Sequence, residues 1–196
     1  FRSGTGIAIP VFSLRSEQSF GVGEFTDLKQ LVDWSKQVGM KMIQILPIND
    51  TTATYTNADS YPYAAISAFA LHPIYLNLSK VVNNKNKKLL EHLEEERIRL
   101  NSLTTVDYET VVKTKFNFVQ QIFPSQAKET FASKDYQNYF EQNKHWLVPY
   151  AAFCYFRDTY GTAHYDEWPA NTTYNQAEIE SLSTKGSKEF DTIAIH

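Results

Sequence analysis

The feature that most constrains this chain is a strand–helix–strand pattern in its first fifty residues. Residues 6–12 combine β-branched and aromatic side chains after a glycine, which predicts a strand. Residues 26–39 place apolar side chains at helical spacing, with Thr26 as the expected N-cap and Gly39 at the end. The apolar run KMIQILPI at 41–48 predicts a second strand, buried on both faces. Two strands joined by one helix through short loops lie parallel, with a right-handed crossover.

A loop of about 25 residues leaves the carboxyl end of the second predicted strand. Functional residues of parallel sheets and barrels gather at this end, and the loop is longer than ordinary strand-to-helix connections. Asn49 and Asp50 open the loop, where they either cap a turn or line the edge of a site. Pro62 rigidly presents Tyr61 and Tyr63 on either side. This arrangement suits a stacking platform for a ligand, although packing of one ring in the core is equally natural.

A helical region without strands is predicted from Val81 to about Gly161. It contains an amphipathic helix at 88–100, a second helix at 107–123, and one or two further helices at 133–161 around Pro149. The predicted fold class is therefore α/β, with a mainly α-helical insertion.

Composition and charge exclude several classes of protein. A net charge of −3 provides no electrostatic footprint for nucleic acid or an anionic membrane, and no apolar run approaches the length of a membrane span. Cys154, the only cysteine, lies among apolar residues, which indicates a buried, inert thiol rather than a nucleophile. The five histidines include no helical i, i+4 pair, so we expect neither a metal nor a cofactor. The aromatic share of 14% indicates either a tyrosine-rich core or rings that face a ligand.

Two glycines, Gly21 and Gly23, raise the question of a phosphate-binding loop. Such a loop needs a third glycine and a direct strand-to-helix connection, and Glu24 would repel phosphate at the helix start. We therefore interpret FGVGEF as a shaped loop that needs the backbone freedom of glycine.

Two stretches in sequence order, GTGIAIPVF through PINDT at 4–51 and DSYPYAAISAFALHP at 59–73, carry a family resemblance. They resemble the start of the catalytic barrel of the 4-α-glucanotransferases, the amylomaltase or disproportionating-enzyme family. The resemblance is strong from residue 4 to about 78 and fainter through WLVPYAAFCYF and YDEWP. The sequences SYPY and ALHP are more similar to the corresponding motifs of the branch that includes the plant cytosolic disproportionating enzyme. The short bacterial amylomaltases carry S-P-Y and asparagine-proline at the matching places.

The resemblance implies a fold and a division of the chain. Residues 1–80 would hold the first two strands and first helix of an incomplete (β/α)8 TIM barrel with its substrate loop. Residues 81–170 would form the helical insertion, and 171–196 would return towards the barrel. Both ends of the sequence look cut from a longer protein, so the expected partner is the remaining barrel of the same polypeptide, in the cytoplasm.

The resemblance also implies substrate-binding residues for a maltooligosaccharide or α-glucan. Tyr63 matches the tyrosine that lines the donor glucose subsite, and Asp59 and Ser60 match its neighbours. Asn49 and Asp50 are weaker candidates for orienting the loop or the sugar. A flat ring suits this role, because the C–H face of a pyranose packs on an aromatic face.

No catalytic residue is assigned in this chain. The family's nucleophile, acid/base glutamate and third aspartate lie on later barrel strands, and their signatures are absent from the 196 residues. We therefore expect the fragment alone to be inactive. An α-amylase-type hydrolase and a non-catalytic glucan-binding fragment stay open as alternatives.

Overall fold

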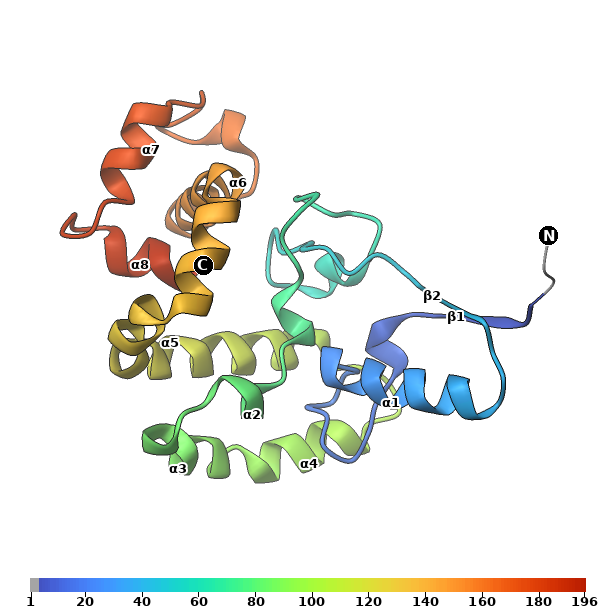
Figure 1. The fold of residues 1–196 in the computed structure, drawn as a ribbon. Helices are drawn as coiled ribbons and strands as arrows, with labels where there is room; N and C mark the ends of the chain where they lie inside the picture. The colour runs from blue at the N-terminus through green and yellow to red at the C-terminus, as the bar shows by residue number, and fades with distance from the viewer. Residues whose placement is uncertain (1–3) are drawn as a thin grey trace.

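The computed structural model describes residues 4–196 (Figure 1). Strands β1 (Gly6–Ile9) and β2 (Met42–Ile45) pair in parallel, and helix α1 (Phe25–Gln37) connects them. Gly6 lies opposite Met42, and Ile9 lies opposite Ile45. The predicted strand–helix–strand unit is thus confirmed.

Both predicted boundaries at the start of this unit are wrong. The first strand ends at Ile9 rather than Phe12, because Pro10 has no N–H to donate and a 3-10 turn follows it at Val11–Ser13. Helix α1 is capped by Glu24 rather than Thr26, since the Asp27 carboxylate accepts the Glu24 N–H at 2.7 Å.

The prediction that the second strand is buried on both faces is wrong for the described residues. Side chains of β2 alternate between exposed and half-buried, and Met42 is 62% exposed. The sheet of residues 4–196 has two strands only, so among the described residues no third strand pairs with β2.

Helices form the rest of the described chain, as the sequence predicts. The predicted helix at 88–100 divides into two at Leu93. Of the one or two helices predicted around Pro149, the structure has one continuous helix. The helices are α2 (Leu78–Val81), α3 (Lys87–Glu91), α4 (Glu94–Ser102), α5 (Tyr108–Ala132), α6 (Lys134–Tyr160), α7 (Gln176–Leu182) and α8 (Phe190–Ile195). Figure 1 shows the strands at one end of the molecule and α6 to α8 at the other. No helix among residues 4–196 has the length and hydropathy needed to cross a bilayer.

The main hydrophobic core joins the N-terminal segment to α4 and α5. Its buried members are Val11, Phe20, Val22, Ile74, Tyr75, Leu78, Leu100, Tyr108, Val111, Val112, Phe118 and Ile122. A smaller cluster packs Ala152 and Phe156 of α6 against Trp168. Since the main core extends across residue 80, the helices after this point are packed directly onto the strand–helix–strand unit.

The glycine loop and the cysteine have the predicted character. Gly21 has a φ of +75°, and a Cβ at Gly23 would lie 1.9 Å from the Val11 carbonyl oxygen. Only glycine fits this loop, which confirms a shaped connection. Cys154 is buried, and burial raises the pKa of its thiol to about 11, so at neutral pH it is a protonated, unreactive group.

Candidate functional site

The loop of residues 49–72 folds back on itself after β2. The Asp50 N–H donates to the Ala70 carbonyl at 2.9 Å, and the His72 N–H donates to the Ile48 carbonyl at 2.9 Å. Asn49 and Leu71 form an antiparallel bridge between these two bonds. Both ends of the loop are therefore fixed at the carboxyl end of β2, between the strands and α6 (Figure 1).

The Asp59 carboxylate holds the first turn of this loop. It is buried, and one of its oxygens accepts the backbone N–H groups of Ala53 at 3.1 Å, Thr54 at 2.8 Å and Tyr55 at 2.7 Å. Bonds from N–H groups to a carboxylate are stronger than neutral ones. In the described residues Asp59 thus organises backbone.

Asp50 has a similar role at the start of the loop, where its carboxylate holds neighbouring groups in place. One carboxylate oxygen accepts the Thr52 N–H at 2.9 Å and the Thr52 hydroxyl at 2.6 Å, and the other accepts the Tyr150 hydroxyl of α6. Asp50 is buried, as is Asp59, so both loop carboxylates are engaged within the protein.

The tip of the loop presents two aromatic rings to solvent. Tyr61 is 61% exposed and Tyr63 is 60% exposed, and their ring centroids lie 5.5 Å apart. Ser60 is exposed and donates its hydroxyl to the Asn57 carbonyl at 2.7 Å. Neither tyrosine is buried among the described residues, so part of each ring is accessible to a ligand.

A cavity of about 450 Å³ lies beside the loop at the carboxyl end of both strands. This volume falls in the range that holds small molecules. Seven residues of the loop line it: Asn49, Thr51, Asn57, Asp59, Ser60, Pro62 and His72. The opposite wall includes Phe12, Arg15, Thr104, Val106 and Tyr108. The cavity therefore brings together three of the predicted site residues, Asn49, Asp59 and Ser60. Asp50 and Tyr63 are not among its lining residues, and Tyr63 lies at the exposed tip of the loop.

A buried histidine that the site prediction missed closes the floor of this cavity. The His72 ring lies 2.8 Å from the Tyr108 hydroxyl through Nε2, and its Nδ1 accepts the Ile74 N–H at 3.2 Å. Because Nδ1 accepts a backbone N–H, Nε2 carries the proton and donates to Tyr108. Burial lowers the pKa of His72, against the opposing influence of Asp50 and Asp59. The sequence signal that could have marked His72 is its position in ALHP, one of the motifs that carry the family resemblance.

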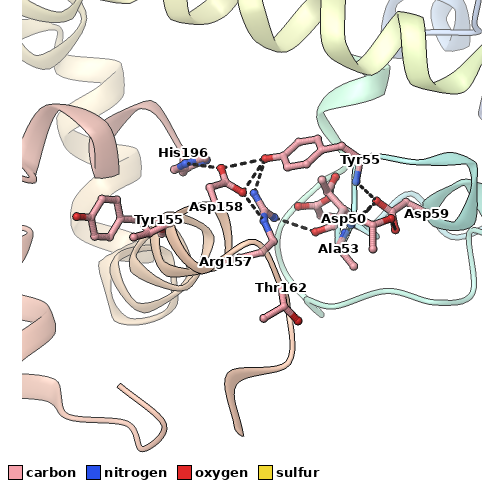
Figure 2. Close-up of polar contacts among 12 residues, drawn as sticks. Asp50, Ala53, Tyr55, Asp59, Tyr155, Arg157, Asp158, Thr162 and His196 are labelled. Atoms are coloured by element: carbon pink, nitrogen blue, oxygen red, sulfur yellow. Dashed lines mark hydrogen bonds and ion pairs between the residues drawn. The ribbon is translucent and has the colours of Figure 1, made fainter. Parts of the chain in front are cut away.

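Helix α6 supplies a second group of residues that sequence reasoning missed. Arg157 and Asp158 of α6 face Tyr55 of the loop, and His196 lies on the other side of Asp158 (Figure 2). No local pattern marks these residues, because more than 100 positions separate Arg157 from its loop partners. Among residues 4–196 no group of three or more His, Cys, Asp or Glu side chains is arranged to hold a metal ion.

Parallel strands, and a long loop at their carboxyl end that lines a cavity and exposes two aromatic rings, define an α/β protein with a candidate ligand site. Comparison with known proteins agrees with this class and identifies the family within it. A family model described as 4-alpha-glucanotransferase matches residues 9–196. The chain belongs to this family.

Individual relatives carry the same description. The chain is 35% identical to the 4-alpha-glucanotransferase DPE2 of Oryza sativa subsp. japonica over 193 residues, which are 98% of this chain and 20% of the relative. It is 35% identical to the 4-alpha-glucanotransferase of Chlamydia muridarum over 170 residues, covering 86% of this chain and 31% of the relative. The chain thus spans about a fifth to a third of the curated relatives that it matches.

Proposed function

We propose that this chain is the N-terminal part of the catalytic (β/α)8 barrel of a 4-α-glucanotransferase. The whole protein would move α-1,4-glucan segments from a donor to a glucose or glucan acceptor. Family membership supports this activity, and so does the parallel β1–α1–β2 unit, which is the repeating element of such a barrel. The observation that carries the proposal within the chain is the exposed Tyr63 ring at the carboxyl end of β2.

The contribution of this chain would be to bind and orient the donor sugar. The Tyr63 ring offers an aromatic face to the C–H face of a pyranose. An electron-rich ring also stabilises the positive charge that develops in an oxocarbenium-like transition state. Ser60 and Asn49 line the adjoining cavity, where a hydroxyl and an amide can bond sugar hydroxyls. Asp59 and Asp50 would act indirectly, by holding the loop.

The chemical step would use residues beyond this chain. A retaining transfer needs two carboxyl groups about 5 to 5.5 Å apart, one as nucleophile and one as acid and base. Asp50 and Asp59 are buried and hydrogen-bonded within the loop, which argues against either as nucleophile. We therefore assign both catalytic carboxylates to later strands of the barrel and no catalytic residue to this chain.

The remaining assignments rest on the family resemblance. We propose that 1–80 is the first barrel unit with the substrate loop, that 81–170 is the helical insertion, and that 171–196 returns towards the barrel. The substrates would be maltooligosaccharides or larger α-glucans, the site would need no cofactor, and the protein would act in the cytoplasm.

The test uses the full-length protein that contains this chain. It is incubated with maltose, with and without glycogen, and free glucose and longer maltooligosaccharides are separated by chromatography. Glucose release coupled to longer products is the expected result. Glucose without extended products would indicate an α-amylase-type hydrolase, in which water is the acceptor. Glucan binding without any product would indicate a non-catalytic binding protein. Either of these outcomes would overturn the proposal.

A further inference from the structure

A single arginine of α6 joins this helix to the 49–72 loop. The Arg157 side chain is 3% exposed, and each of its donor nitrogens has a partner. Nη1 donates to the Thr52 carbonyl at 2.8 Å, and Nη2 donates to the Tyr55 hydroxyl at 2.6 Å. Nε donates to the Asp158 carboxylate at 2.8 Å (Figure 2). Two of these three partners belong to the loop, so the guanidinium connects the loop to α6.

Tyr55 is held in a backbone conformation that needs such support. Its φ is +59°, in the left-handed region that costs free energy for any residue other than glycine. Its N–H bonds Asp59 at 2.7 Å, its hydroxyl bonds Asp158 at 3.0 Å, and the Arg157 guanidinium lies 5.1 Å from the ring centroid. Contacts on three sides therefore fix this position.

The bonds continue from Tyr55 towards the aromatic tip. Asp59 accepts the Tyr55 N–H, and the Asp59 carbonyl accepts the Thr51 hydroxyl at 2.5 Å. Asp59 is followed directly by the SYPY segment, in which Pro62 restricts the backbone before Tyr63. Thr52 and Tyr55 are thus connected to the segment that carries Tyr63 by a short, hydrogen-bonded stretch.

The charge on Arg157 is maintained despite its burial. Burial is the largest single influence and would lower the pKa of the guanidinium, but the hydrogen bond to Asp158 and the electrostatic influence of the neighbouring acidic groups together outweigh it, and the pKa is raised. Burial lowers the pKa of His196, which lies 3.3 Å from Asp158, so this imidazole is uncharged at neutral pH. At neutral pH Asp158 therefore has one cationic neighbour among these residues, Arg157.

We propose that Arg157 is a positioning residue for glucan transfer, which sets where the 49–72 loop presents Tyr63 without touching the substrate. This inference rests on the proposed function. A lysine would not replace it, because the planar guanidinium reaches three partners in fixed directions and an ammonium group does not. A displacement of about 1 Å in a substrate-positioning group can cost up to a hundredfold in rate.

The test compares Arg157→Met and Arg157→Lys in the full-length protein, with Arg99→Met as the matched control. The Arg99 side chain is 51% exposed and pairs with Glu96 in the same helix. We expect both Arg157 variants to lose about tenfold or more in kcat/KM for transfer at a temperature where thermal unfolding shows them folded. The control should stay within about twofold.

A double-variant cycle separates positioning from a purely structural role. If Arg157 acts through Tyr63, adding Arg157→Met to Tyr63→Ala should reduce kcat/KM by less than about twofold further, although each change alone is severe. Multiplying losses would overturn the inference, as would a folded Arg157→Met protein with unchanged kinetics. If Arg157→Met does not fold, Tyr55→Phe takes its place, because this change removes only the hydroxyl bonds to Arg157 and Asp158. Absence of transfer in the unmodified protein would instead refute the proposed function.

Discussion

At the scale of single residues, Tyr63 is the side chain on which the proposed chemistry can be tested most directly. Replacing it by alanine in the full-length protein removes the exposed ring and leaves the buried loop contacts of Asp59 intact. We expect kcat/KM for glucan transfer to fall about tenfold to a hundredfold, because the sugar loses a stacking face and the developing charge loses a nearby ring. Chromatography of the products of maltose measures this loss.

Two variants make the Tyr63 prediction specific. Tyr63→Phe keeps the ring and should retain most of the transfer activity. Tyr174→Ala removes another tyrosine, 67% exposed and far along the chain, and should leave kcat/KM within about twofold. Full activity of Tyr63→Ala, or an equal loss with Tyr174→Ala, would remove Tyr63 from the site.

His72 predicts a pH dependence of stability. Burial lowers its pKa below the ordinary value of about 6.5, so the unfolded chain binds more protons than the folded protein below that pH. Stability should therefore fall as pH falls from about 6.5 towards the lowered pKa, by at most about 1.4 kcal/mol per pH unit. Asp50, 3.9 Å from Nδ1, together with Asp59 limits the shift, whereas Lys115 adds to it.

His72→Asn should remove this contribution. An asparagine at the same N-cap position can accept the Ile74 N–H and carries no titratable group. The measurement is the melting temperature of the full-length protein at pH 7.5 and 5.5, in which His72→Asn should lose less on acidification than the parent. The exposed His92→Asn is the control and should behave like the parent. Identical losses in all three proteins would show that His72 does not contribute.

At the scale of elements, a buried ion pair joins the start of α1 to α5. Lys115 donates to Glu24 at 2.5 Å and to the carbonyls of Ile74 at 2.6 Å and Leu76 at 2.8 Å. The two side chains are 3% and 1% exposed, and burial lowers the pKa of Lys115 and raises that of Glu24. Lys115→Met should cost about 3–5 kcal/mol of stability, because Glu24 is left buried without its cation.

The double variant Glu24→Gln with Lys115→Met should recover a large part of this loss, since no unpaired charge then remains in the interior. Denaturant unfolding of the full-length variants measures both values. Lys144→Met, which breaks an exposed pair with Glu141 in α6, should change stability by less than about 1 kcal/mol. A double variant less stable than Lys115→Met alone would contradict this view of the pair.

The same elements show what local sequence can predict. Apolar spacing located β1, α1 and β2, because one helix and two strands each leave a periodic pattern. Pro10 changed the end of β1, and the Glu24–Asp27 capping box changed the start of α1. The two pairings that hold the site, Lys115 with Glu24 and Arg157 with the loop, connect residues 91 to 105 positions apart. Such contacts leave no periodic signal, so only the structure reveals them.

The candidate site was less predictable from the sequence than the helices and strands were. The SYPY motif left open whether the Tyr63 ring faces a ligand or packs in the core. Among the described residues this ring is 60% exposed, and that observation comes from the structure alone. Residue type alone did not show which role Asp50 and Asp59 have, since a carboxylate at a strand end can bind a ligand or can accept bonds from the backbone of its own loop. In the structure the Asp59 carboxylate bonds three successive backbone N–H groups and the residue also lines the cavity, so its contact with a substrate stays a prediction.

At the scale of the whole molecule, several exposed apolar residues lie on the β1–α1–β2 unit. Met42 of β2 is 62% exposed, and Val32 and Trp34 of α1 are 53% and 45% exposed. Parallel strands of α/β proteins are ordinarily covered on both faces, and barrel strands are closed by neighbours on each side. We therefore propose that the remaining barrel of the same polypeptide covers this unit.

This proposal predicts how the 196-residue chain behaves when it is produced alone. We expect the isolated chain to self-associate through its uncovered strands, and to show no glucan transfer because it lacks the catalytic pair. Co-expression with the remainder of the full-length protein should restore transfer and a defined size on gel filtration. Met42→Lys, which places a charge on the uncovered strand, should reduce self-association of the isolated chain. Measurable transfer by the purified chain alone would mean that its own carboxylates perform the chemistry, and the assignment of catalysis to later strands would fail.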